Sequence, residues 1–282
     1  FVIEHHYPEC QSTEQTYAAF LDAVVQRTAT LMAHWQAVGF AHGVMNTDNM
    51  SILGETFDYG PFGFLDDYNP SFICNHSDYN GRYAFNQQPN IGLWNCNALA
   101  HALSPLIPIE RLRDILQRYQ PTIEQHYLYL MRKKLGLQTA LDDDGNLIGQ
   151  LLTLMQQSAV DYTIFFRRLC DFSAQSNNDN LRDLFIDRTG FDQWTAQYSA
   201  RLLHENSDNQ QRQASMKRAN PKYILRNYLA QQAIEKAQQG DFSMVENLLQ
   251  VLLTPFDEHP TFESFATFPP QWGKHLEISC SS

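Results

Sequence analysis

The sequence HGVMNTDN occupies residues 42–49, between a long apolar-periodic segment and a short apolar run. It is followed, after a short apolar run, by DYG at residues 58–60. Asp48, Asn49 and Asp58 place three oxygen-bearing side chains close together in loop-like sequence between apolar segments. In proteins, Mg²⁺ is typically held by one or two carboxylates together with water and phosphate oxygens. We therefore predict a metal site for a phosphate ester at these two loops.

Composition limits the class of protein. The chain has 282 residues, of which 43% are hydrophobic, and a formal net charge of −11. Because a nucleic-acid backbone or an anionic membrane surface requires a basic face, we expect no nucleic acid and no membrane among its partners. No stretch approaches the roughly 18 apolar residues of a membrane span. The five cysteines form no C-x-x-C pair, which argues against a disulfide scaffold or a zinc site and favours a reducing compartment.

The segment before the central stretch is predicted to be a long helix over about 13–38. Ser12 and Gln15 have the spacing of a capping box, and apolar residues then recur at helical spacing as far as Trp35. Gly39 is the expected end of the helix. His34, on or beside the apolar stripe, is interpreted as a structural histidine.

After the central stretch, residues 51–66 are predicted to form a β-hairpin with its turn near Gly54 and Glu55. In such a hairpin Asp48, Asn49 and Asp58 would lie at the same end. Residues 67–89 lack any period and form a long loop, which carries Cys74. Its many aromatic residues favour an ordered, functional loop.

The remainder reads as mainly helical, so the predicted class is mainly α with a short hairpin. Helices are expected at about 94–103, 109–135 with a break at Pro121, 147–174, 178–187, 190–204, 221–239 and 243–253. An acidic turn is expected at 141–146, a surface loop at 205–214, and an irregular strap at 254–272. Residues 216–227 form a locally basic segment, interpreted as a solvated face in which Asn220 caps the helix that Pro221 begins.

The central stretch resembles the catalytic loop H-R-D-x-x-x-x-N and the D-F-G motif of protein kinases. Asn49 falls on the metal-binding Asn of that loop and Asp58 on the Asp of D-F-G. The position of the catalytic base is Val44, which cannot accept a proton. An ordinary kinase mechanism is therefore disfavoured.

The chain as a whole resembles the selenoprotein O family of kinase-fold protein adenylyltransferases. The likeness rests on several long motifs and on the terminal cysteine, Cys280. The motifs are HHYPE at 5–9, HGVMNTDNMSI at 42–52, DYGPFGFLD at 58–66, GRYAF at 81–85, QP at 88–89, NP at 220–221 and RN at 226–227.

The resemblance implies a pseudokinase that transfers AMP from ATP to Ser, Thr or Tyr hydroxyls of protein substrates. Asp48 would be the general base, while Asn49 and Asp58 would hold Mg²⁺ or Mn²⁺, and Asp58 would thereby contact the nucleotide. It also implies a protein-kinase-like C-lobe at 1–145 and a helical C-terminal extension at 146–282, which we expect to pack as one unit. The family's N-lobe would precede Phe1, so we expect this chain alone to be inactive or nearly so. Cys280 in place of selenocysteine fits a bacterial, cytoplasmic member.

Two other functions remain open from the sequence. One is a catalytically silent scaffold, although such a protein has no reason to keep Asp48, Asn49 and Asp58 together. The other is a kinase that transfers the γ-phosphate, which Val44 disfavours. A redox role is a further hypothesis, in which Cys74 and Cys280 form a disulfide that restrains the long loop; two unpaired thiols are equally compatible with the sequence.

Overall fold

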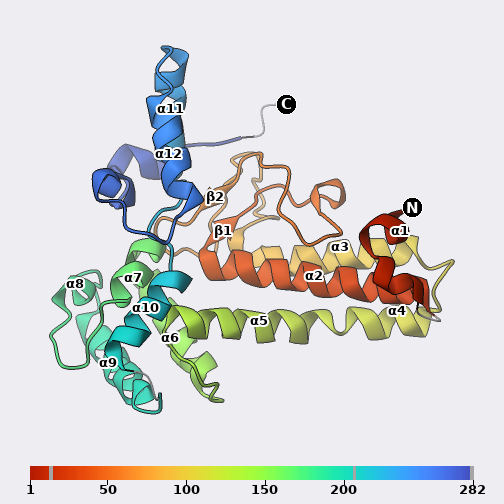
Figure 1. Ribbon diagram of the computed structural model, residues 1–282, viewed down its shortest axis with the longest axis horizontal. Helices are drawn as coiled ribbons and strands as arrows, with labels where there is room; N and C mark the ends of the chain where they lie inside the picture. The colour runs from red at the N-terminus through yellow and green to blue at the C-terminus, as the bar shows by residue number, and fades with distance from the viewer. Residues whose placement is uncertain (13–14, 206–207, 280–282) are drawn as a thin grey trace.

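The computed structural model describes residues 1–12, 15–205 and 208–279. Within these residues the chain is mainly helical and contains one two-stranded sheet. Figure 1 shows long helices lying beneath a region of loops that carries the sheet, while α11 and α12 stand away from this body. The prediction of a mainly α protein with a short hairpin is confirmed.

Helix α2 (Thr16–Val38) is the centre of the helical layer. Its buried residues, among them Leu21, Val25 and Met32, pack against α3 (Gln88–Ala102), α4 (Ile109–Leu116) and α5 (Tyr119–Lys134). The helix ends, as predicted, at Gly39, whose φ of 76° is a left-handed conformation that glycine adopts without strain. Residues 13–14 of the expected capping box lie outside the described residues, and Ser12 Oγ donates instead to Glu9 O at 3.1 Å.

The sheet joins different segments from those predicted. Strand β1 (Phe40–Ala41) pairs antiparallel with β2 (Gly63–Phe64), so that Phe40 lies opposite Phe64. The expected hairpin within 51–66 is wrong: a turn does form at Gly54, whose N donates to Ser51 O, but residues 51–62 contain no strand, and β2 pairs with β1 instead. The ring of Phe40 packs on those of Phe62 and Phe64, and this aromatic contact selects the distant segment as the partner. Residues 42–62 therefore form one connection between paired strands.

The second half contains more helices than expected. They are α6 (Asp144–Gln157), α7 (Tyr162–Leu169), α8 (Asp179–Arg182), α9 (Arg188–Leu202), α10 (Asn209–Ala219), α11 (Asn227–Gln238) and α12 (Ser243–Leu253), and the short α1 (Val2–His6) begins the chain. The predicted helix at 147–174 is two helices, since Asp161 caps α7 by accepting a hydrogen bond from Ile164 N. Similarly, 109–135 divides into α4 and α5, and Pro121 lies in the first turn of α5, where it removes no helical hydrogen bond.

Two predictions around the basic segment are wrong. Helix α10 occupies most of the expected surface loop at 205–214, and α11 begins at Asn227 rather than Pro221. Asn220 does not cap a helix start; its Nδ2 donates to Lys134 O at 2.9 Å. The acidic turn is confirmed at 142–143, but α6 already begins at Asp144, which is buried against Arg201. The strap at 254–272 contains 3₁₀ turns at Pro260–Ala266 and Gln271–His275.

A buried cluster of one arginine and two aspartates joins three distant parts of the chain. Arg226, just before α11, is bonded to Asp66, which follows β2, and to Asp161, which begins α7. Arg226 Nη1 lies 2.9 Å from Asp161 Oδ2, and both side chains are almost fully buried. The group therefore fixes the C-terminal helices to the segment that leaves the sheet. The largest cluster of buried side chains likewise takes members from both sides of residue 145, and the division there stays a prediction.

Candidate active site

The loop after β1 is held by hydrogen bonds to its backbone carbonyls. Four carbonyls, one at the end of β1 and three in the loop, each accept a hydrogen bond from a side chain, so the path of the loop is fixed. The donor and acceptor pairs are Cys74 Sγ with Ala41 O (3.4 Å), Asn75 Nδ2 with Gly43 O (3.3 Å), Asn49 Nδ2 with Val44 O (3.0 Å) and Asn95 Nδ2 with Met45 O (3.0 Å).

His42 connects this loop to the one that carries Asp58. Its ring is buried and stacks on Trp35, and Nε2 lies 2.8 Å from Phe57 O. Since a carbonyl can only accept, Nε2 carries the proton, and Nδ1 accepts from Val44 N. Burial lowers the pKa of His42, and the nearby carboxylate of Asp58 partly opposes that shift. His42 is therefore a neutral structural link rather than an acid or base.

Gly43 is required by both conformation and space. Its φ is 83°, and a Cβ at this position would lie 2.6 Å from Cys74 Sγ and 2.9 Å from Pro61 O. The loop that carries Asp58 and the loop that carries Cys74 thus both press against the backbone here. A glycine lets three segments meet where any side chain would separate them.

Asp58 has an unusual backbone. Its φ is 55°, a left-handed conformation that costs an L-residue roughly 1 kcal/mol. Phe57 O, immediately before it, is fixed by His42, and Asp58 O accepts from Gly60 N at 2.8 Å. The side chain is exposed. Such strain, held by the surrounding contacts, is characteristic of functional positions.

Asp48 and Asn49 lie in a single 3₁₀ turn, Thr47–Asn49. Asp48 is exposed, whereas Asn49 is half-buried and uses its Nδ2 to close the loop, which leaves Oδ1 as an available acceptor. The structure thus places the three predicted residues on one strand connection, with Asp58 joined to the Asn49 loop through His42.

The donor set fits a hydrated divalent cation. No group of three or more His, Cys, Asp or Glu side chains positioned to hold a metal occurs among the described residues. The loop therefore does not form a metal site whose ligands are all His, Cys, Asp or Glu side chains. One carboxylate from Asp58 and one amide oxygen from Asn49 match Mg²⁺ or Mn²⁺, which keeps waters and takes phosphate oxygens.

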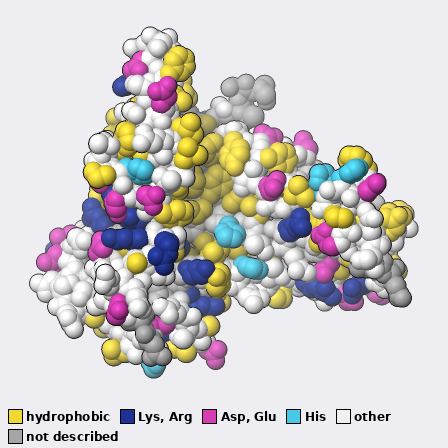
Figure 2. Space-filling model, in the orientation of Figure 1, with side chains coloured by type: hydrophobic (Ala, Val, Ile, Leu, Met, Phe, Trp, Pro, Cys, Tyr) yellow, Lys and Arg dark blue, Asp and Glu magenta, His cyan; other side chains and the backbone are white. Residues whose placement is uncertain are grey.

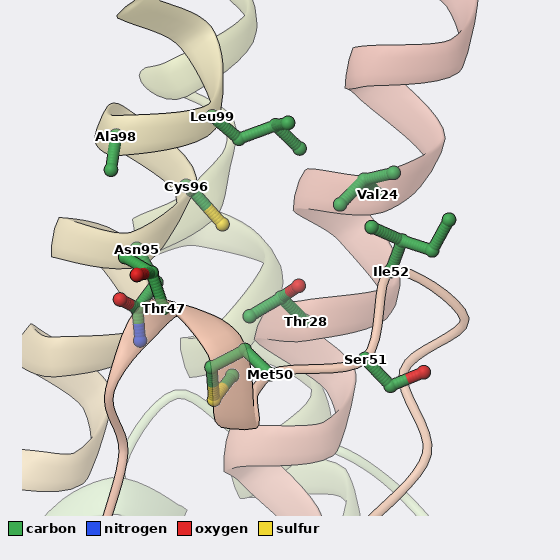
Figure 3. A pocket seen from close by; sticks show the side chains of 10 residues that line it. All are labelled: Val24, Thr28, Thr47, Met50, Ser51, Ile52, Asn95, Cys96, Ala98 and Leu99. Carbon is green, nitrogen blue, oxygen red and sulfur yellow. The ribbon is translucent and has the colours of Figure 1, made fainter. Parts of the chain in front are cut away.

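A cavity of about 320 Å³ is lined in part by the same loop. Figure 3 shows Thr47 and Met50 of the loop between the two helices that form the walls, with Val24 and Thr28 on α2 and Asn95, Cys96, Ala98 and Leu99 on α3. None of its lining side chains is acidic or basic. Burial raises the pKa of Cys96 to about 11, which disfavours the reactive thiolate. This cavity is not the place for a metal-bound nucleotide.

A family model described as Protein adenylyltransferase SelO matches residues 1–253. The chain belongs to the SelO family. Protein nucleotidyltransferase YdiU of Aliivibrio salmonicida (strain LFI1238) is 56% identical over 281 residues, and that of Pseudomonas fluorescens (strain Pf0-1) is 57% identical over 282 residues. Each match covers 100% of this chain and 58% of the relative. The predicted family is confirmed, and the SelO chain spans 58% of the length of these relatives.

Several residues that hold the SelO site together were not recognised in the sequence. Gln88 accepts from His42 N and donates to Phe40 O, both at 2.8 Å, and Trp35 Nε1 donates to Thr56 Oγ1. Gln88 was noted as part of a motif, but nothing local indicated that its side chain reaches β1. Asn95 gave no signal, because its partner Met45 lies far along the chain.

Cys74 is placed beside the site, while Cys280 lies outside the described residues. The Cys74 thiol is buried, and burial raises its pKa to about 12, which disfavours the reactive thiolate. The C-terminal tail nevertheless approaches this loop, since His76 N donates to Ile278 O at 2.7 Å. In the sequence, Cys74 lies two residues before His76, and Cys280 lies two residues after Ile278.

Proposed function

We propose that the protein containing this chain transfers AMP from ATP to Ser, Thr or Tyr hydroxyls of protein substrates. The observation that supports this most directly is that the connection 42–62 carries three oxygen-bearing side chains, those of Asp48, Asn49 and Asp58. The same connection has Val44 at the position that corresponds to the catalytic base of a kinase. The family description as a protein adenylyltransferase, and the names of the relatives as protein nucleotidyltransferases, agree with it.

In the proposed reaction Asp48 takes the proton of the substrate hydroxyl as its oxygen attacks the α-phosphorus. The new bond joins that oxygen to phosphorus, the bond to the bridging oxygen breaks, and pyrophosphate leaves. A divalent cation, when bound by Asn49 and Asp58, neutralises charge on the phosphates. His42 and Gln88 keep the two loops in register but do not touch the reacting atoms.

The proposal predicts which part of ATP reaches the protein substrate. With ATP labelled at the α-phosphate, the longer YdiU relatives should label protein, whereas γ-labelled ATP should leave protein unlabelled. The 282-residue chain alone should give little or no label, because it spans 58% of those relatives. EDTA should abolish the transfer. Transfer of γ-label would identify a kinase, and ATP binding without either label would favour a scaffold.

The relatives are bacterial, and no helix in the described part of the chain is long and apolar enough to cross a membrane. A cytoplasmic location for the SelO protein remains part of the proposal.

We also propose that Cys74 and Cys280 form a regulatory disulfide. It is supported by the hydrogen bond from His76 N to Ile278 O, which brings the tail to the loop that carries Cys74. Because the Cys74 thiol donates to Ala41 O, a disulfide at Cys74 would remove a hydrogen bond at the start of the active-site loop. Under oxidising conditions, a non-reducing peptide map should show one cross-linked peptide containing both cysteines. Cys280→Ser should remove it and Cys170→Ser should not. Free thiols at both positions after oxidation would contradict this proposal.

A further inference from the structure

A second cavity, of about 500 Å³, lies between α2, α5 and α10. It shares no lining residue with the proposed transferase site. Its polar lining comes from His34, Lys133, Lys134, Ser215 and Arg218. Its apolar wall includes Val38, Leu130 and Phe256. The volume is within the range of about 300–1,000 Å³ that small-molecule sites occupy.

The charge in this cavity is positive and unbalanced. Although the chain carries a net charge of −11, none of the lining residues is acidic. Figure 2 shows Lys and Arg side chains gathered in the region where α5 and α10 meet beneath α12. Nearby cations have carboxylate partners: Lys217 lies 3.2 Å from Asp171, and Lys222 binds Glu258 and Glu263. Among the described residues, Lys133, Lys134 and Arg218 have no such partner.

Lys134 is the most informative residue of the lining. It is only 5% exposed, and its ammonium lies 4.2 Å from the ring centroid of Phe166 and 5.1 Å from that of Tyr162. These cation–π contacts compensate part of the cost of burial, but the described chain provides no hydrogen-bond acceptor for the amine. Burial accordingly lowers the pKa of Lys134 to about 7. An anion in the cavity would supply the missing partner.

We propose that this cavity binds a small phosphorylated molecule that also carries an apolar or aromatic group. Three basic side chains and the Ser215 hydroxyl suit a dianionic phosphate better than a single carboxylate. Arg218 presents a planar fork for two phosphate oxygens, and Lys134 adds a point charge from within the wall. The apolar wall of Val38, Leu130 and Phe256 accepts the rest of the ligand. Because Ala37 and Val38 line the cavity and directly precede Gly39 and β1, the site borders the end of the helix that leads into the transferase loop.

Phenyl phosphate is a suitable probe, with inorganic phosphate and phenol as its two halves. Calorimetric titration of the 282-residue chain at low salt should show binding of phenyl phosphate, weaker binding of phosphate and none of phenol. Lys134→Met, which keeps the length and packing of the stem, and Arg218→Gln should each weaken binding by about tenfold or more. Lys236→Met, at an exposed lysine on α11 outside the cavity, should change the affinity less than about twofold.

Proton uptake provides a second readout. The charged and titratable groups that line the cavity with Lys134 are His34 from α2, Lys133 from α5 and Arg218 from α10. Its ammonium also interacts with Tyr162 of α7 and with Cys170, which follows that helix. If phosphate recharges Lys134, binding at pH 8 should take up protons, seen as a dependence of the heat on the buffer's ionisation enthalpy. Lys134→Met should remove most of that uptake.

Three results would overturn the proposal. They are no detectable binding of phenyl phosphate, affinities that neither Lys134→Met nor Arg218→Gln changes, or an equal loss with Lys236→Met, which would indicate unspecific attraction. Arg218 is exposed, and among the described residues its side chain has no hydrogen-bond or ion-pair partner. Arg218→Gln should therefore fold normally, and it tests the site even if Lys134→Met folds poorly.

Discussion

Replacement of Asp48 by asparagine is expected to lower the rate of AMP transfer by about 10²–10⁴-fold, the usual contribution of a general base. The change keeps the size and polarity of an exposed side chain in the turn Thr47–Asn49, so the fold and the nucleotide affinity should be nearly unaffected. The measurement is the rate of α-label transfer by a longer SelO protein carrying the substitution, together with its affinity for ATP and Mg²⁺.

A matched control is Glu55→Gln, which removes another exposed carboxylate from the same strand connection. It should leave the rate within about twofold of the parent, because surface charges that touch nothing have small effects. Equal losses in both variants would mean that net charge near the nucleotide, rather than Asp48, controls the rate. A fully active Asp48→Asn protein would remove Asp48 from the proposed mechanism.

Replacement of Arg226 by methionine is expected to lower the free energy of unfolding by about 3–5 kcal/mol, the usual cost of removing one partner from a buried ion pair. Asp161 would remain buried without its cation, and Asp66 would lose its link to the C-terminal helices. Since whole domains are stable by only about 5–15 kcal/mol, this is a large fraction of the total. Urea denaturation of the 282-residue chain measures it.

Lys274→Met is the control for Arg226. Lys274 Nζ lies 2.7 Å from Asp67 Oδ2, but this pair is partly exposed, so its loss should cost at most about 1 kcal/mol. Adding Asp161→Asn to Arg226→Met should restore part of the stability, because the neutral amide still accepts the cap hydrogen bond from Ile164 N. A loss below about 1 kcal/mol for Arg226→Met would show that water or protonation relieves the buried carboxylates.

The sequence was most informative where structure depends on neighbours along the chain. The apolar spacing before Trp35 located α2, and Gly39 marked its end because only a glycine enters the left-handed conformation without strain. The motifs identified the SelO family, because a match between runs of consecutive residues does not depend on how the segments pack.

Predictions failed where a side chain contacts a distant segment. Asn220 is of a residue type that often caps helices, but its side-chain amide donates to Lys134 O, 86 residues away in the sequence. Alternation predicted a hairpin within 51–66, whereas Gly63 and Phe64 pair with Phe40 and Ala41, which lie before that segment. The basic segment at 216–227 was interpreted as a solvated face, although Arg218 shares a cavity wall with Lys134.

By itself, the sequence determined the family, the extent of α2, and the residue types at 42–60 that suit metal and phosphate chemistry. Only the tertiary structure decided which strands pair, how Cys74, Asn75 and Asn95 fix the loop of Asp48, and where unpaired cations meet. The physical reason is that helix spacing and backbone limits act over a few residues, whereas these contacts depend on which surfaces are buried together.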